Sequence, residues 1–173
     1  MISRCLVRAA IDALLPVLFA VAVHELGHIA VMYILGIKAD SVHSRFWGIR
    51  INADLSRIGY AGELAVMLAG SGVDLLLAVM PGQSEKYAYA CAAYGVFNLL
   101  PADFLDGGDV LRTALLWLGV SPKAVYGICR AATVTVTVLV WIAAVYLALR
   151  GFGTALLISS CYMMLTCFFA RNS

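Results

Sequence analysis

Long apolar runs, separated by short polar stretches, dominate the chain. Such runs extend from about 11 to 37, 62 to 80, 124 to 149 and 152 to 169. Each approaches or exceeds the roughly 20 residues that a helix needs to cross the hydrocarbon layer of a membrane. A further apolar region, from about 87 to 118, is too long for one simple span and is interrupted by the sequence NLLPADFLDGGD. The pattern predicts an all-α polytopic membrane protein with about five transmembrane helices, the third of them broken.

The break in the third apolar region contains Pro101, Gly107 and Gly108 together with three aspartates. Irregular backbone at membrane depth is tolerated only where protein buries it or where it lines a water-filled cavity. We therefore expect this break to face the interior of the protein.

The main polar stretch lies between the first two apolar runs, from 38 to 60. Gly36, just before it, is a predicted stop for the first helix. Within the stretch, the sequence FWGIRINADL (46–55) partly alternates apolar and polar residues. The alternation predicts a short β-strand or β-hairpin at the membrane edge, with a helix as the alternative.

Composition agrees with a membrane protein. Of the 173 residues, 63% are hydrophobic and 13% are charged, and the mean hydropathy is +0.94. Soluble domains are roughly half apolar and about a quarter charged. We expect one domain, residues 1–173, with a core from 11 to 118 and additional spans at 124–149 and 152–169, and the lipid bilayer as a partner.

Charge and cysteine content exclude other classes. The net charge is +2 and the basic residues are not clustered, so no nucleic-acid partner is expected. No cysteine pair has the CxxC spacing of a sulfur metal site. We interpret the five cysteines as small hydrophobic residues: Cys5, Cys91, Cys129, Cys161 and Cys167.

The first apolar run contains the sequence HELGH, from His24 to His28. Residues four apart lie on one face of a helix, so the two imidazoles can reach one Zn²⁺ ion at about 2.0–2.1 Å. Glu25 is displaced by about 100° around the helix axis, beside such an ion, where a carboxylate can take a proton from water. Ionisable groups inside a membrane are costly and usually functional. HELGH therefore predicts a metal site rather than a chance combination.

Two histidines leave a catalytic zinc ion one protein ligand short. His43 is the only other histidine and lies in the polar stretch, where we interpret it as a surface residue. Asp106 is followed by two glycines, which would let the backbone bend and bring its carboxylate close to a metal. The broken region nevertheless offers three candidate carboxylates: Asp103, Asp106 and Asp109.

HELGH and NLLPADFLDGG together resemble the site-2 protease family of intramembrane zinc metalloproteases. That family carries HExxH on one transmembrane helix and N-x-x-P-x(4)-D-G on a later one. The resemblance covers about residues 20–111, and the small size is similar to that of the sporulation-type members. It implies zinc as cofactor, His24, His28 and Asp106 as ligands, and Glu25 as catalytic base. It also implies that Asn98 contacts the substrate backbone or the oxyanion, although a structural role within the broken helix is an equal alternative.

Three positions depart from the family pattern. Ser71 and Asp74 stand about where relatives show proline and asparagine, and Asp109 stands where relatives often have a basic residue. An aspartate in a span requires neutralisation, a partner or water. The roles of Asp74 and Asp109 therefore stay open at this stage.

The predicted function is cleavage of a membrane-spanning or membrane-tethered protein by zinc-activated water. A non-proteolytic metal-binding protein or transporter is the alternative, and a pseudoprotease is a third. The expected location is a bacterial cell membrane, as a multi-pass protein. The substrate, the orientation and any regulatory membrane partner or self-association are left open by the sequence.

Overall fold

The computed structural model describes residues 2–37, 39–45, 48–53, 58–151 and 155–169. These residues form six helices and one two-stranded sheet. The helices are α1 (Ile2–Ile34), α2 (Gly59–Val79), α3 (Glu85–Asn98), α4 (Asp106–Trp117), α5 (Pro122–Leu149) and α6 (Ala155–Phe169). The strands are β1 (Ala39–Arg45) and β2 (Gly48–Ala53), between α1 and α2.

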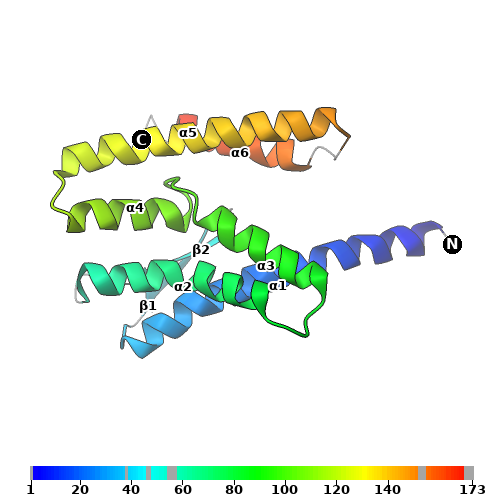
Figure 1. Ribbon diagram of the computed structural model, residues 1–173, viewed down its shortest axis with the longest axis horizontal. Helices are drawn as coiled ribbons and strands as arrows, with labels where there is room; N and C mark the ends of the chain where they lie inside the picture. The colour runs from blue at the N-terminus through cyan, green and yellow to red at the C-terminus, as the bar shows by residue number, and fades with distance from the viewer. Residues whose placement is uncertain (1, 38, 46–47, 54–57, 152–154, 170–173) are drawn as a thin grey trace.

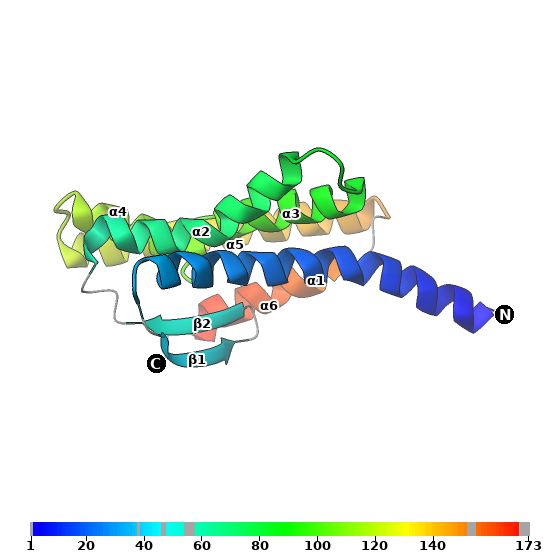
Figure 2. The same ribbon diagram turned by 90° about the horizontal axis from the view of Figure 1, so that it is seen from below.

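Helices α1, α2 and α3 pack against one another, and α5 and α6 lie above them in Figure 1. Helix α4 packs against α2 and α5, and α6 packs against α5. The N-terminal part of α1 extends beyond the other helices in both views (Figures 1 and 2). The bundle therefore brings α4, late in the chain, to the helices that come first.

The first helix ends at Ile34, two residues before Gly36, the predicted stop signal. Gly36 has a φ of 69°, a left-handed conformation that glycine adopts without steric cost. Ile37 donates its backbone N–H to the carbonyl of Met32 at 2.9 Å, which closes the helix end. The chain then enters β1, which pairs antiparallel with β2. In Figure 2 this sheet lies below α1 while α2 lies above it.

Three helices are long and apolar enough to cross a membrane: Leu14–Ile34 of α1, α2 and α5. They support a membrane protein, but the described residues do not confirm five spans. The break divides the third apolar region into helices of 14 and 12 residues, and α6 has 15. At about 1.5 Å per residue such helices reach only about 18–22 Å, whereas the hydrocarbon core is about 30 Å thick. The predicted second span corresponds to α2 and the predicted last span to α6. Residues 152–154, at the start of that last span, lie outside the described part.

The break itself, residues 99–105, is buried in part, since its apolar residues pack on the bundle whereas Asp103 is exposed. Ala102 and Leu105 are 0% and 5% exposed and pack with Val136 of α5. Its backbone is bonded locally, since the N–H of Leu105 donates to the carbonyl of Ala102 at 2.8 Å. Helix α5 contributes a further bond, because the N–H of Asp103 donates to Thr133 Oγ1 at 3.0 Å. The irregular backbone therefore meets the requirement for satisfied polar groups.

Candidate metal centre

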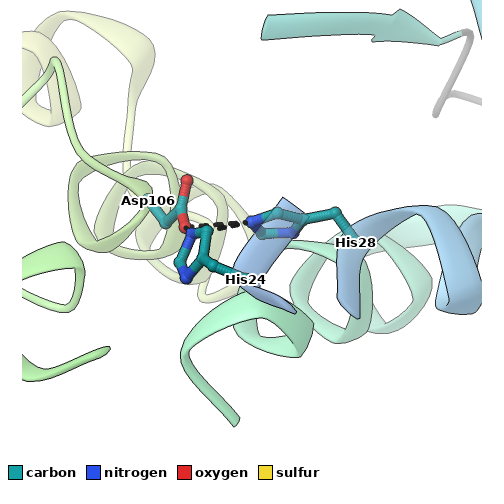
Figure 3. A group of neighbouring side chains, drawn as sticks. All are labelled: His24, His28 and Asp106. Atoms are coloured by element: carbon teal, nitrogen blue, oxygen red, sulfur yellow. Dashed lines mark hydrogen bonds and ion pairs between the residues drawn. The ribbon is translucent and has the colours of Figure 1, made fainter. Parts of the chain in front are cut away.

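His24 and His28 lie one turn apart on α1, and Asp106 is the first residue of α4. Figure 3 shows the three side chains pointing toward one another. Asp106 Oδ2 lies 2.9 Å from His24 Nε2 and 3.1 Å from His28 Nε2. The two Nε2 atoms are 3.1 Å apart. Three side chains separated by up to 82 positions in the sequence thus present one atom each to a common point.

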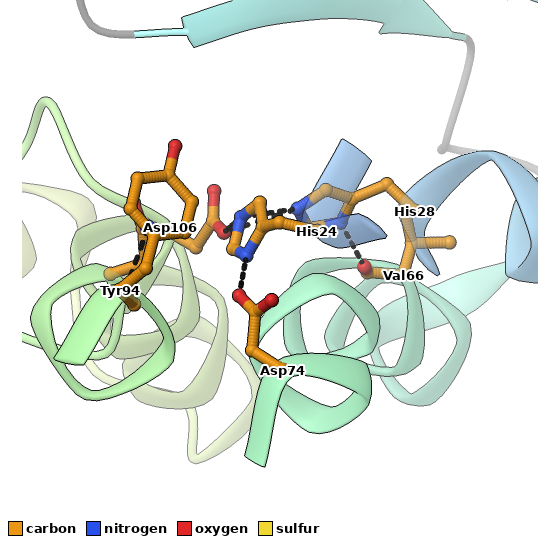
Figure 4. A network of polar contacts seen from close by, with 7 residues as sticks. His24, His28, Val66, Asp74, Tyr94 and Asp106 are labelled. Carbon is orange, nitrogen blue, oxygen red and sulfur yellow. Dashed lines mark hydrogen bonds and ion pairs between the residues drawn. The ribbon is translucent and has the colours of Figure 1, made fainter. Parts of the chain in front are cut away.

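The remaining nitrogen of each imidazole faces an oxygen from α2 (Figure 4). His28 Nδ1 lies 2.7 Å from the carbonyl oxygen of Val66, and His24 Nδ1 lies 2.8 Å from Asp74 Oδ2. A carbonyl only accepts, so His28 Nδ1 must carry the hydrogen and donate it. In the neutral ring, His28 Nε2 then presents a lone pair toward the other two groups. Helix α2 thereby sets the orientation of both rings without contributing an atom to the cluster.

The donor set fits a zinc ion. When the Nδ1 hydrogens of both rings are directed to Asp74 and Val66, the two Nε2 lone pairs and a carboxylate oxygen form an arrangement that a cation satisfies. Ligand atoms at 2.0–2.1 Å from a tetrahedral zinc ion are about 3.3 Å apart, close to the observed 2.9–3.1 Å. The side chains of His24 and His28 are 3% and 13% exposed, and that of Asp106 is 28% exposed. The site is therefore shielded on the histidine side and more open at the aspartate.

This arrangement of the two imidazoles requires close packing of α1 and α2. A Cβ on Gly70 of α2 would lie 2.5 Å from His28 Nε2 and 2.8 Å from His24 Nε2. A Cβ on Gly27 of α1 would lie 2.8 Å from the carbonyl oxygen of Ala69. Glycine at both positions lets the two helices approach closely, as small residues do at helix interfaces in membranes.

Gly107 and Gly108 serve a different purpose from the predicted backbone bend. Neither has a positive φ, and both lie inside α4. A Cβ on Gly107 would collide with the carbonyl oxygen of Leu99, and one on Gly108 with that of Ala102. The glycines are needed because the first turn of α4 packs directly on the backbone of the break. That contact sets the position of Asp106.

The other two aspartates of the broken region lie outside the cluster. Asp103 is exposed, and its backbone rather than its carboxylate is bonded to Thr133. Asp109 forms an ion pair with Arg112, one turn further along α4. The three candidates are thus separated, and only Asp106 joins the two histidines. The side chain of His43, in β1, lies outside the described part of the structure.

The roles of Glu25 and Asn98 stay predictions. Glu25 follows His24 on α1, and its side chain is partly buried. Asn98 ends α3 and is 5% exposed. Its Nδ2 donates to the carbonyl of Tyr94 at 3.1 Å, a contact that fits the structural alternative for this side chain.

Sequence reasoning did not assign three of the surrounding groups. The sequence indicated that Asp74 has a role, because an aspartate in an apolar span requires a partner. It did not indicate which residue that partner is. The carbonyl of Val66 leaves no trace in sequence because every residue has one. Tyr94 packs its ring edge-to-face with His24, at a centroid distance of 5.0 Å. A tyrosine among apolar residues gives no specific indication of such a contact.

The interpretation of the cysteines as small hydrophobic residues stays a prediction. Cys91, Cys129 and Cys161 are free thiols, and the first two are buried. None of them belongs to the cluster of His24, His28 and Asp106. The side chains of Cys5 and Cys167 lie outside the described part.

Comparison with known proteins gives one result about the fold. No family model matches the sequence, and no curated protein matches it. Among solved structures, the chain is similar to the site-2 protease from Methanocaldococcus jannaschii. The TM-score is 0.63, the similarity covers 92% of this chain and 77% of that one, and 21% of the residues are identical. The resemblance carried by the two motifs is confirmed at the level of architecture: the chain has the fold of a site-2 protease.

Proposed function

We propose that the chain is an intramembrane zinc metalloprotease that cleaves a membrane-spanning or membrane-tethered protein. The observation that carries the proposal is the convergence of His24 Nε2, His28 Nε2 and Asp106 Oδ2 within 3.1 Å. Three protein ligands with an open fourth position are typical of catalytic zinc sites, whereas structural sites are closed by four. The site-2 protease fold supports the same assignment.

The chemistry is divided among the residues of the site. A zinc ion held by the two histidines and Asp106 would polarise the scissile carbonyl and make water a nucleophile at neutral pH. Glu25 takes a proton from the attacking water and gives it to the nitrogen of the leaving amine. The Nδ2 of Asn98 carries two hydrogens, so one can serve the Tyr94 carbonyl and the other the substrate or the oxyanion.

The substrate has to be extended before it can react, because a helix keeps its own peptide groups bonded. Strand addition is one way to hold an extended segment. Within the described residues, β1 and β2 form a sheet of two strands. We propose that this hairpin lies at the membrane edge and pairs with the substrate backbone.

Three proteins test the proposal: wild type, Glu25→Gln and Asp106→Ala. Each is purified in full length, analysed for zinc, and reconstituted in liposomes with a single-span reporter protein containing helix-breaking residues. We expect about one zinc per wild-type chain and cleavage products from within or beside the span. Glu25→Gln should hold zinc without cleaving, and Asp106→Ala should lose zinc.

Asp103→Ala is the matched control, because it removes an exposed carboxylate from the same break. It should retain both zinc and cleavage. Cleavage by Glu25→Gln at the wild-type rate would refute the assignment of the base. Zinc flux into the liposomes without proteolysis would favour the transporter alternative.

A further inference from the structure

Asp74 is a carboxyl group with no access to solvent, inside a helix long enough to span a membrane. It is 0% exposed and belongs to α2. A buried charged or polar group is costly unless it is paired. Its Oδ2 lies 2.8 Å from His24 Nδ1, while Oδ1 has no hydrogen-bond partner among the described residues. The contact with His24 is therefore the interaction that accounts for Asp74 in this place.

The fold is shaped around Asp74. Helix α3 crosses α2 at Gly95, where a Cβ would lie 2.9 Å from the Cβ of Asp74 and 3.3 Å from the carbonyl oxygen of Ser71. The glycine lets α3 close over the carboxyl group and exclude water. Figure 4 shows Asp74 reaching up from α2 to the edge of the His24 ring that faces away from Asp106.

The two imidazoles of the cluster are held differently. His28 donates to a neutral carbonyl, that of Val66, and His24 faces the carboxyl group of Asp74. Hydrogen bonds to carboxylates are shorter and roughly twice as strong as those between neutral groups. Such a bond keeps the hydrogen on Nδ1, prevents rotation of the ring, and makes Nε2 a better electron donor. The two contacts have similar lengths, 2.8 Å for His24 and 2.7 Å for His28, so the rings differ in the chemistry of their acceptors rather than in the lengths of the contacts.

We propose that Asp74 is a positioning residue for the metal centre: it accepts the Nδ1 hydrogen of His24 and directs Nε2 of that ring toward the ion. The inference rests on the proposed zinc site. It also explains why this chain has an acid at this position in an apolar helix, since a carboxyl group is the strongest acceptor available to the imidazole. Asp74 contacts no reacting atom and acts only through His24.

The test compares Asp74→Ala, Asp74→Asn and Ser71→Ala with wild type, all as purified full-length protein in detergent. Ser71→Ala is the matched control, because Ser71 is 1% exposed, lies one turn away on α2, and its Oγ has no hydrogen-bond partner among the described residues. The measurement is the dissociation constant for zinc, by competition with a chelator. Loss of such an outer partner typically weakens metal affinity about 10–100-fold.

We expect a loss of that size in Asp74→Ala, a smaller loss in Asp74→Asn, and wild-type affinity in Ser71→Ala. The amide oxygen of asparagine still accepts from Nδ1, which explains the partial rescue. A second readout does not depend on activity. In protein with ¹⁵N-labelled histidine, the His24 Nδ1–H resonance of the zinc-loaded form should lie downfield and move upfield in Asp74→Ala.

Equal zinc affinity in wild type and Asp74→Ala overturns the inference, as does a loss that Asp74→Asn does not reduce. Absence of zinc from the wild type overturns the proposed function instead, so the two failures are distinguishable. If Asp74→Ala does not fold, the zinc affinities of wild type and Asp74→Asn are compared instead. Weaker binding with unchanged helix content supports the inference, and unchanged binding overturns it.

Discussion

Gly70→Ala tests whether the packing of α2 beneath the two imidazoles defines the metal site. The new methyl group would lie 2.5 Å from His28 Nε2 and 2.8 Å from His24 Nε2. Ordinary contact requires about 3.5 Å or more, so one or both rings must move by up to about 1 Å. Metal–ligand distances tolerate only about 0.2 Å. Zinc affinity should therefore fall sharply, and the rate of cleavage should drop by about 100-fold or more.

The same substitution should leave the helix intact. Alanine is favoured over glycine in a helix interior by up to about 1 kcal/mol. The metal-free protein should nevertheless unfold at a lower temperature than Gly72→Ala, because the rings can move only by giving up their contacts with Val66 and Asp74. Gly72→Ala provides the matched control, since Gly72 lies in α2 with nothing within 4 Å of the position of its Cβ. It should gain the same helix stability and retain zinc and cleavage.

The assay measures zinc per chain after gel filtration, zinc affinity by chelator competition, and thermal unfolding of the metal-free proteins in detergent. Gly70→Ala should differ from Gly72→Ala in all three measurements. If Gly70→Ala binds zinc as tightly as wild type, the packing of α2 beneath the two rings does not define the site. The geometric argument would then be refuted.

Three further outcomes follow from the broken region and the cluster. Gly107→Ala should destabilise the protein and lower its zinc content, because the new methyl group would collide with the carbonyl of Leu99. Gly127→Ala is the control, since there is open space around Gly127, and it should change neither quantity in the same unfolding and metal assays. Thr133→Val leaves the Asp103 N–H without its acceptor and should cost about 1–3 kcal/mol in unfolding experiments; an unchanged midpoint would contradict this. Removal of zinc by a chelator should abolish cleavage, and added zinc should restore it; activity that persists without metal would argue against the proposed chemistry.

The asymmetric support of the two imidazoles bears on how the site is assembled. Both outer contacts come from α2, through the backbone of Val66 and the side chain of Asp74. The ligand from α4 depends instead on a break that α5 holds through Thr133. The three-helix core therefore orients the histidines, whereas α5 helps to position the aspartate. This gives a physical role to one of the additional spans, for which the sequence indicated only hydrophobicity.

Local spacing determined much of what the sequence predicted. Two histidines four residues apart share a helix face whatever surrounds them, and Pro101 lacks the backbone N–H that a continuous helix needs at that point. Apolar runs also indicate the solvent directly, because lipid and water select different side chains. The membrane class, the HELGH pair and the existence of a break could therefore be predicted from the sequence.

Tertiary structure alone decided which distant groups meet. Asp103, Asp106 and Asp109 lie within seven residues, and the one that reaches the histidines is set by where α4 begins and how its glycines pack. The pairing of Asp74 with His24 joins residues 50 positions apart. The number of helices long enough to span the membrane depends on where each helix ends. In the third apolar region, the packing of the break determines those ends. Such contacts arise from the relative placement of whole helices, and no local pattern of residues encodes that placement.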